Sequence, residues 1–226
     1  MRLFRIDGPV YRFLETITNL LLLNLLFLVC SIPIVTIGPS LTATYYVTLK
    51  MIRNEETNIF KNFFQSFRTN FKQGMILGIG VLLLLAILLI DIRALTYLTT
   101  IPEDFAKVLV FVVGFLLLIV TAIAVYLFAV LAQFDNKSKE LIKWSAIIAL
   151  RHLPVTLLFL LIVAIPILIM YLRPAVFLQI VFPIMLLAGF AGIAYIQSYF
   201  LVRVFSYYIP KEEEDSQEDE EEDIAY

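Results

Sequence analysis

Residues 17–49 contain no charged side chain, and this run of 33 residues constrains the fold more than any other feature of the chain. A helix needs about 20 apolar residues to cross the hydrocarbon core of a bilayer. Pro33 and Pro39 interrupt the run near its middle, and a proline removes a helical hydrogen bond at its position. The run is therefore predicted to form two membrane helices joined by a tight turn, or one helix followed by a re-entrant segment.

Further apolar runs extend the membrane prediction along the chain. Segments low in charge occupy residues 73–90, 106–132, 153–172 and 174–202. Within lipid, backbone polar groups must find partners inside the segment, so these runs are expected to be helices. The sequence thus predicts an all-α polytopic membrane helical bundle with about six spans, or five if residues 17–49 cross once. The second span, from Pro39 to Met51, is short enough to cross incompletely.

The composition also favours a membrane protein over a soluble domain. Hydrophobic residues make up 61% of the chain and charged residues 16%, whereas about a quarter of the residues of a soluble domain are charged. Ten of the 19 Asp and Glu lie in residues 212–223. Residues 1–207 are therefore predicted to form a single integral membrane domain, and residues 211–226 an acidic, disordered cytoplasmic tail. Nucleic acid is excluded as a partner of this tail.

The distribution of Lys and Arg predicts the orientation, because cytoplasmic loops of membrane proteins carry an excess of these residues. With six spans and the N-terminus inside, 14 basic residues face the cytoplasm and 3 face outward. With a single crossing at residues 17–49, the numbers become 11 and 6. The first arrangement is favoured, so we expect a multi-pass protein of the bacterial cell membrane with both termini in the cytoplasm.

Two basic segments are predicted to be amphipathic helices at the membrane interface. In residues 56–72, five Phe recur at helical spacing on one face, opposite polar and basic residues that include Asn62. The segment 137–152 occupies an equivalent place before a later span. Packing against the bundle end and docking of a cytoplasmic partner account for the same pattern and stay open. The candidate partner-contact residues are Phe60, Phe64, Phe67, Arg68, Asn70, Lys72, Trp144 and Arg151.

Repeated patterns appear along the second half of the chain. Each basic segment precedes an apolar run, a short turn and another apolar run, which suggests an internal repeat of residues 56–133 and 139–207. Small residues four apart permit close helix contact in a bilayer, and such pairs occur at 74 and 78 and at 188 and 192. Pro166 and Pro183 lie within later spans and are expected to kink them.

No catalytic or metal-binding pattern occurs in the sequence. The chain has one Cys and one His, and neither has further ligand residues at metal-binding spacing. Phosphate-binding loops and hydrolase motifs are also missing. We therefore predict that the chain is not an enzyme and has no cofactor. Polar residues within the spans are expected to form hydrogen bonds between helices: Asn19, Asn24, Tyr45, Tyr46, Gln197 and Ser198.

The first third of the chain carries polar, Pro and Gly positions in a specific order. They are Asn19, Asn24, Pro33, Gly38, Pro39, Tyr46 and Lys50, followed by a block of Phe, Asn, Lys and Gln at residues 64–73. In this order and spacing over residues 16–73, the chain resembles the YesL family of bacterial integral membrane proteins. The resemblance supplies no catalytic residues.

What the resemblance implies about function comes from gene neighbourhood. Genes of YesL-family proteins often neighbour carbohydrate ABC importers and polysaccharide-degrading enzymes. The resemblance therefore implies an accessory or scaffold component linked to carbohydrate ABC uptake, with the lipid bilayer and ABC importer subunits as partners. The alternative is a small-solute or sugar permease in its own right, since six spans, kinked helices and a repeat are typical of transporters.

Overall fold

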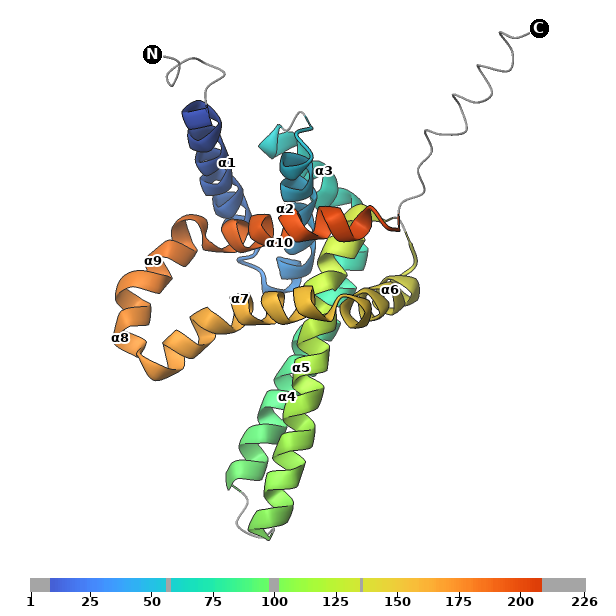
Figure 1. The fold of residues 1–226 in the computed structure, drawn as a ribbon, viewed down its shortest axis with the longest axis vertical. Helices are drawn as coiled ribbons and strands as arrows, with labels where there is room; N and C mark the ends of the chain where they lie inside the picture. The colour runs from blue at the N-terminus through green and yellow to red at the C-terminus, as the bar shows by residue number, and fades with distance from the viewer. Residues whose placement is uncertain (1–8, 56–57, 98–101, 135, 209–226) are drawn as a thin grey trace, which may run out of the picture.

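The computed structural model describes residues 9–55, 58–97, 102–134 and 136–208, and this part of the chain is largely helical (Figure 1). Five of its helical segments are long and apolar enough to cross a membrane, and the prediction of an all-α polytopic bundle is confirmed. The elements are α1 (Pro9–Cys30), η1 (Ile34–Thr36), α2 (Ile37–Ile52), α3 (Ile59–Thr69), α4 (Phe71–Tyr97), α5 (Glu103–Gln133), α6 (Ser138–Arg151), α7 (Leu153–Leu172), α8 (Pro174–Val176), η2 (Phe177–Val181), α9 (Phe182–Ile184), η3 (Met185–Gly189) and α10 (Phe190–Phe205).

The uncharged run folds as two helices joined by a tight turn, which is one of the two predicted arrangements. α2 begins at Ile37, so Pro39 lies in the first turn of the helix and not at its boundary. The N–H groups of a first turn have no partner within the helix, so a proline is tolerated there. With 16 residues, α2 is about 24 Å long, shorter than the hydrocarbon core of about 30 Å. The short second span is therefore not among the five long segments.

The surface helix predicted over residues 56–72 is shorter than expected. Asn58 caps α3 by accepting a hydrogen bond from the Lys61 N–H at 3.1 Å, and the helix ends before Asn70. Residues 56–57 lie outside the described residues. Phe71 and Lys72 begin α4 instead. The predicted aromatic face is therefore divided between two helices, which is a correction to the sequence-based boundaries.

The buried face of α3 also differs from the prediction. Asn62, expected on the polar face, is buried together with Ile59, Phe63 and Ser66. These positions recur at the spacing of a helix face that packs against a bundle. Ile59 and Phe63 join an apolar cluster with Leu23 and Val47, from α1 and α2. Packing onto the bundle therefore determines the orientation of α3.

Two long helical hairpins diverge from the region of α2 (Figure 1). The first hairpin consists of α4 and α5. The second consists of α7 and the irregular segment from α8 to α10, which we call the last span. Pro166 lies within the continuous helix α7. Pro183 lies in the three-residue α9, and the π-helical turns η2 and η3 flank it. Because proline cannot donate a backbone hydrogen bond, wider turns accommodate it, and Figure 1 shows the last span curving there.

The core lies where α2 meets the other helices. Ten of the 16 residues of α2 are buried. A second apolar cluster joins α2 to α5, α6, α7 and α10 around Tyr126 and Phe159. Large apolar side chains farther along the hairpins, such as Phe111 and Leu161, are exposed. Such a distribution suits helices surrounded by lipid tails rather than water.

The domain boundaries and the internal repeat stay predictions. α3, α4 and α5 are followed by α6, α7 and the last span, in the order on which the repeat of residues 56–133 and 139–207 rests. The predicted acidic tail at residues 211–226 lies outside the described residues.

Candidate functional site: a buried polar layer beside an apolar cavity

Glycine residues bring the backbones of α2 and α4 into contact. A Cβ atom added at Gly38 would lie 2.0 Å from the Gly74 carbonyl oxygen and 3.1 Å from the Gly78 Cα atom. Pro39 belongs to the same contact, because a Cβ atom at Gly74 would lie 3.0 Å from the Pro39 Cα atom. The pair at 74 and 78 is therefore used for close helix packing. Among the described residues, no atom lies within 4 Å of a Cβ added at Gly192, in the other small-residue pair.

Asn24 of α1 is fully buried and supports the irregular last span. Its Nδ2 donates to the carbonyl oxygens of Met185 at 3.1 Å and Leu186 at 2.8 Å. Its Oδ1 accepts a hydrogen bond from the Ala191 N–H at 3.1 Å. These backbone groups lie where the π-helical turn η3 joins α10. Irregular backbone at membrane depth is tolerated only where protein groups satisfy it, and Asn24 does so here.

Two side-chain pairs join α2 to α10. The Tyr45 hydroxyl donates to Gln197 Oε1, and the hydroxyl oxygens of Thr48 and Ser198 lie 2.8 Å apart. All four side chains are buried. The expected hydrogen bonding between helices is thus found for Asn24, Tyr45, Gln197 and Ser198. Within the described part of the chain, Gln197 Nε2 has no hydrogen-bond partner.

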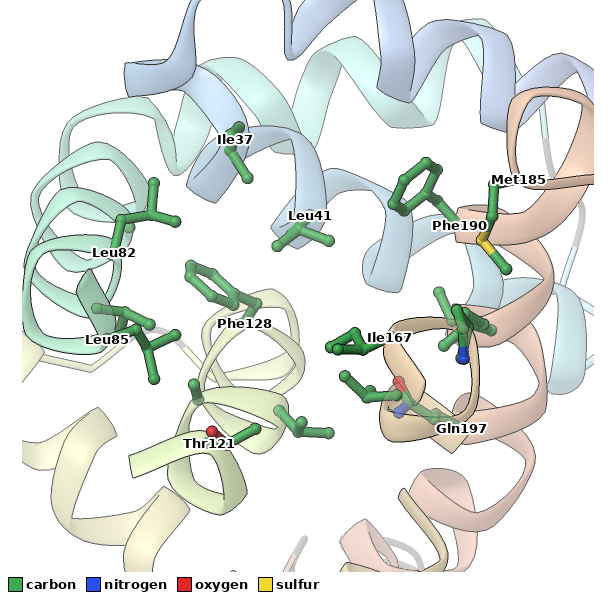
Figure 2. A pocket seen from close by; sticks show the side chains of 18 of the residues that line it. Ile37, Leu41, Leu82, Leu85, Thr121, Phe128, Ile167, Met185, Phe190 and Gln197 are labelled. Carbon is green, nitrogen blue, oxygen red and sulfur yellow. The ribbon is translucent and has the colours of Figure 1, made fainter. Parts of the chain in front are cut away.

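Tyr45, Thr48, Gln197 and Ser198 form a buried polar layer between α2 and α10. An apolar cavity of about 630 Å³ lies beside this layer (Figure 2). Its walls come from α2, α4, α5, α7 and the last span, so both long hairpins contribute to its lining. Figure 2 shows apolar side chains around most of it, with the amide of Gln197 at one side. Residues from each wall include Ile37, Leu82, Phe128, Ile167 and Phe190. The arrangement can hold an apolar ligand and offer it very few hydrogen bonds.

The other residues that carry the family resemblance, Asn19, Pro33, Tyr46 and Lys50, do not line the cavity. Lys50 Nζ is 5.2 Å from the centroid of the Tyr46 ring, one helical turn earlier, and 3.6 Å from the Glu55 carboxylate. Asn19 is half-buried five residues before Asn24 in α1. This spacing puts the two Asn residues on different faces of the helix. Pro33 is exposed in the turn after α1.

Some of the predicted partner-contact residues are exposed. On α3 these are Phe60, Phe64 and Arg68, and Lys72 is exposed at the start of α4. Phe67, in contrast, is half-buried and stacks on the Phe63 ring, with centroids 6.1 Å apart.

The other predicted contact residues take part in packing at the helix ends. Asn70 Nδ2 donates to the Ser66 carbonyl oxygen at 3.2 Å, so this side chain helps to end α3. Trp144 and Arg151 of α6 are exposed in part and also contact Tyr208. The Trp144 and Tyr208 ring centroids are 6.0 Å apart, and Arg151 Cζ is 5.8 Å from the Tyr208 centroid. These two residues therefore also hold the end of the last span against α6.

Hydrogen bonds join the start of α4 to the start of α6. Gln73 Nε2 donates to the Asn136 carbonyl oxygen at 2.8 Å and lies 3.2 Å from Ser138 Oγ. Arg53, just after α2, donates to Gln133 Oε1 at 2.7 Å. The helices α3 and α6 therefore lie at the same end of the bundle.

Threonines of the membrane helices were missed by sequence reasoning. Thr156 Oγ1 of α7 donates to the Ala149 carbonyl oxygen of α6 at 2.7 Å and lies 3.0 Å from the Tyr126 hydroxyl of α5. Thr48 pairs with Ser198 as described. A threonine within a long apolar run is the sequence feature that could have indicated a hydrogen bond between helices. Thr42 has the same feature, but its hydroxyl donates to the Gly38 carbonyl oxygen of its own helix. Spacing alone cannot separate the two cases.

Within the described ranges, no group of three or more His, Cys, Asp or Glu could hold a metal ion.

Comparisons with known proteins find similarity to proteins of unknown function. A family model described as "Protein of unknown function, DUF624" matches residues 20–92, which include Asn24 and the contact of Gly38 with Gly74 and Gly78. The chain is 29% identical over 154 residues to "Uncharacterized protein YteU" of Bacillus subtilis (strain 168), covering 66% of this chain and 68% of that protein. No solved structure matches the chain. The similarity is to proteins of unknown function.

Proposed function

We propose that this chain is a non-enzymatic accessory or scaffold protein of the bacterial cell membrane, linked to a carbohydrate ABC uptake system. Both ends of the chain then lie in the cytoplasm, and α3 and α6 face the partner. The resemblance to the YesL family motivates the link to ABC uptake. The match to a family of unknown function and the apolar helices agree with an uncharacterised membrane protein.

One observation carries the choice of contact surface. Basic side chains are exposed on α3, at the start of α4 and on α6, and these segments lie at one end of the bundle. We call this set the basic surface: Lys61, Arg68, Lys72, Lys139, Lys143 and Arg151. Glu140 of α6 is exposed among them, but the surface is predominantly basic and favours a partner that carries acidic patches.

The residues within the spans favour an accessory role over the alternative, a sugar permease. A sugar-binding site needs several hydrogen-bonding side chains, because each sugar hydroxyl loses water on binding. The cavity between the hairpins has mostly carbon in its walls, with polar side chains only at Tyr45, Thr121 and Gln197. Tyr45 and Gln197 are already bonded to each other. Asp91 and Arg93 are exposed near the end of α4, away from the cavity.

Affinity purification in a mild detergent tests the proposal. The tagged chain is expected to recover the membrane and nucleotide-binding subunits of a carbohydrate ABC importer, identified by quantitative mass spectrometry. Charge reversal on the basic surface should reduce that recovery, whereas matched reversals on the opposite side should not. The first set is Lys61→Glu, Arg68→Glu and Lys72→Glu, and the control set is Arg93→Glu, Lys107→Glu and Arg173→Glu.

Two results would contradict the accessory role. The first is recovery of no importer subunit with the unaltered chain. The second is sugar uptake by liposomes that contain only the purified chain, above uptake by empty liposomes, which would establish the permease instead.

A further inference from the structure

We propose that the apolar cavity binds one acyl chain of a bilayer phospholipid, and that the ester carbonyl of this chain accepts a hydrogen bond from Gln197. The proposed lipid site lies between the helical hairpins and does not depend on the partner surface or on the uptake system proposed above.

The walls of the cavity select an apolar occupant. The volume of about 630 Å³ falls within the range of ligand sites, about 300–1,000 Å³. Leu41, Leu85 and Val163 are among the apolar side chains contributed by three different helices. An ordered water needs roughly two to four polar partners, and the few polar side chains of the lining cannot supply them over this volume. An acyl chain needs none.

The amide of Gln197 selects one polar group on that occupant. The side chain is 1% exposed, and its Oε1 already accepts a hydrogen bond from the Tyr45 hydroxyl. Its Nε2 is buried without an acceptor among the described residues. A buried donor without a partner is unfavourable, so a ligand that supplies an acceptor gains affinity. An ester carbonyl is an acceptor that brings no donor of its own and no charge.

The position of Gln197 along α10 matches the ester of a phospholipid. Arg203 is exposed six residues later, near the end of the helix. At ~1.5 Å per residue, the Gln197 backbone lies about 9 Å from the Arg203 backbone along the helix axis. A headgroup at the level of Arg203 therefore leaves the ester near Gln197. The acyl chain then extends along the cavity toward Phe177 and Phe182, which line it from η2 and α9.

The architecture gives this lipid a structural consequence. The last span breaks its regular hydrogen bonding at η3, and Met185 and Leu186 of η3 line the cavity. Asn24 satisfies the backbone of this wall from outside the cavity. An acyl chain would support the same wall from inside, because it fills the space between the two diverging hairpins.

Lipid titration of the purified, extensively washed protein tests the site. The probes are dioleoyl phosphatidylglycerol and its di-O-alkyl ether analogue, which keeps the chains and headgroup but lacks the carbonyl groups. Native mass spectrometry in detergent is expected to show one tightly held lipid per chain. We expect the ester lipid to bind about tenfold more tightly than the ether lipid, since one hydrogen bond to a buried donor separates them.

Four variants assign the preference to the cavity. Gln197→Leu should abolish the preference for the ester lipid, whereas Tyr45→Phe keeps the amide and should retain it. Leu41→Trp fills the cavity and should prevent tight binding of both lipids. Leu83→Trp is the matched control, because Leu83 is exposed on α4 outside the lining. Melting temperatures in detergent show which variants are folded.

Three outcomes would overturn the proposal. Equal binding of ester and ether lipids by the unaltered protein removes the role of Gln197. Equal lipid retention by Leu41→Trp and Leu83→Trp means that only lipid on the outer surface is bound. Absence of tightly held lipid on the unaltered protein at saturating phosphatidylglycerol excludes the site.

Discussion

The contact between α2 and α4 leaves no room for a side chain at Gly38, so Gly38→Ala should strongly destabilise the protein. The added Cβ would lie 2.0 Å from the Gly74 carbonyl oxygen. Ordinary carbon–oxygen contacts are about 3.3–3.6 Å, so the two backbones must separate by roughly 1 Å or more. Overpacking typically costs about 1–3 kcal/mol. We expect the upper end of this range, because backbone rather than a flexible side chain must move.

The assay measures the melting temperature in detergent, with intrinsic fluorescence as the signal for unfolding. At roughly 2–4 °C per kcal/mol for a chain of this size, a loss of about 3 kcal/mol corresponds to about 6–12 °C. The effect should follow the room available: Gly38→Ala is most harmful, and Gly78→Ala and Gly74→Ala follow, with closest approaches of 2.9 Å and 3.0 Å.

Gly80→Ala provides the matched control in α4. No atom lies within 4 Å of a Cβ at this position among the described residues. Alanine favours a helix over glycine by about 0.5–1 kcal/mol, so Gly80→Ala should leave the melting temperature unchanged or raise it. The reasoning is refuted if Gly38→Ala melts with the unaltered protein, or if Gly80→Ala is as harmful as Gly38→Ala.

Three further experiments test other buried contacts by the same melting assay. Asn24→Leu should lower the free energy of unfolding by about 3 kcal/mol or more, because it leaves two carbonyl oxygens and an N–H without their partner; a change near zero would show that water or the helix itself satisfies them. In a double-mutant cycle, Thr48→Val and Ser198→Ala should show a coupling of about 1 kcal/mol, and strict additivity would contradict the hydrogen bond between them. Phe63→Ala should cost about 3–5 kcal/mol, whereas Phe60→Ala should cost little because this ring is 50% exposed; equal losses would place α3 differently on the bundle.

The sequence predicts the positions of the long helices well. The expected runs at 73–90, 106–132 and 153–172 lie inside α4, α5 and α7. Hydropathy measures the free energy of transferring a helix into lipid, and this free energy decides where a whole span lies. Helix ends depend on single hydrogen bonds, which hydropathy does not see. For this reason α3, which is capped by Asn58 and ends before Asn70, is shorter than the helix predicted over 56–72.

The arrangement of the helices could not be predicted in the same way. The expected close packing of small residues is found at Gly74 and Gly78, whereas among the described residues the space around a Cβ added at Gly192 is open. Nothing in the local sequence distinguishes the two pairs, because the difference lies in Gly38, a residue far away in the chain. The same holds for Gln197, whose partner Tyr45 lies on another helix.

The π-helical turns illustrate a further limit. Pro183 predicts a local disturbance, but the sequence does not say whether the helix kinks, breaks or widens. The response depends on a partner for the released backbone groups, and Asn24 supplies one from α1. The polar residue and the proline are individually visible in the sequence, and only their proximity in the structure connects them.

The central claim is that the basic surface, formed by α3, the start of α4 and α6, lies in the cytoplasm. Cysteine labelling tests it most directly. Cys30→Ala removes the single cysteine, after which one cysteine is introduced at a time. A membrane-impermeant maleimide applied to intact cells should label cysteines placed at Lys107 and Arg173. Cysteines at Lys61 and Lys143 should react only after the membrane is opened. Labelling of position 61 or 143 in intact cells would contradict the account.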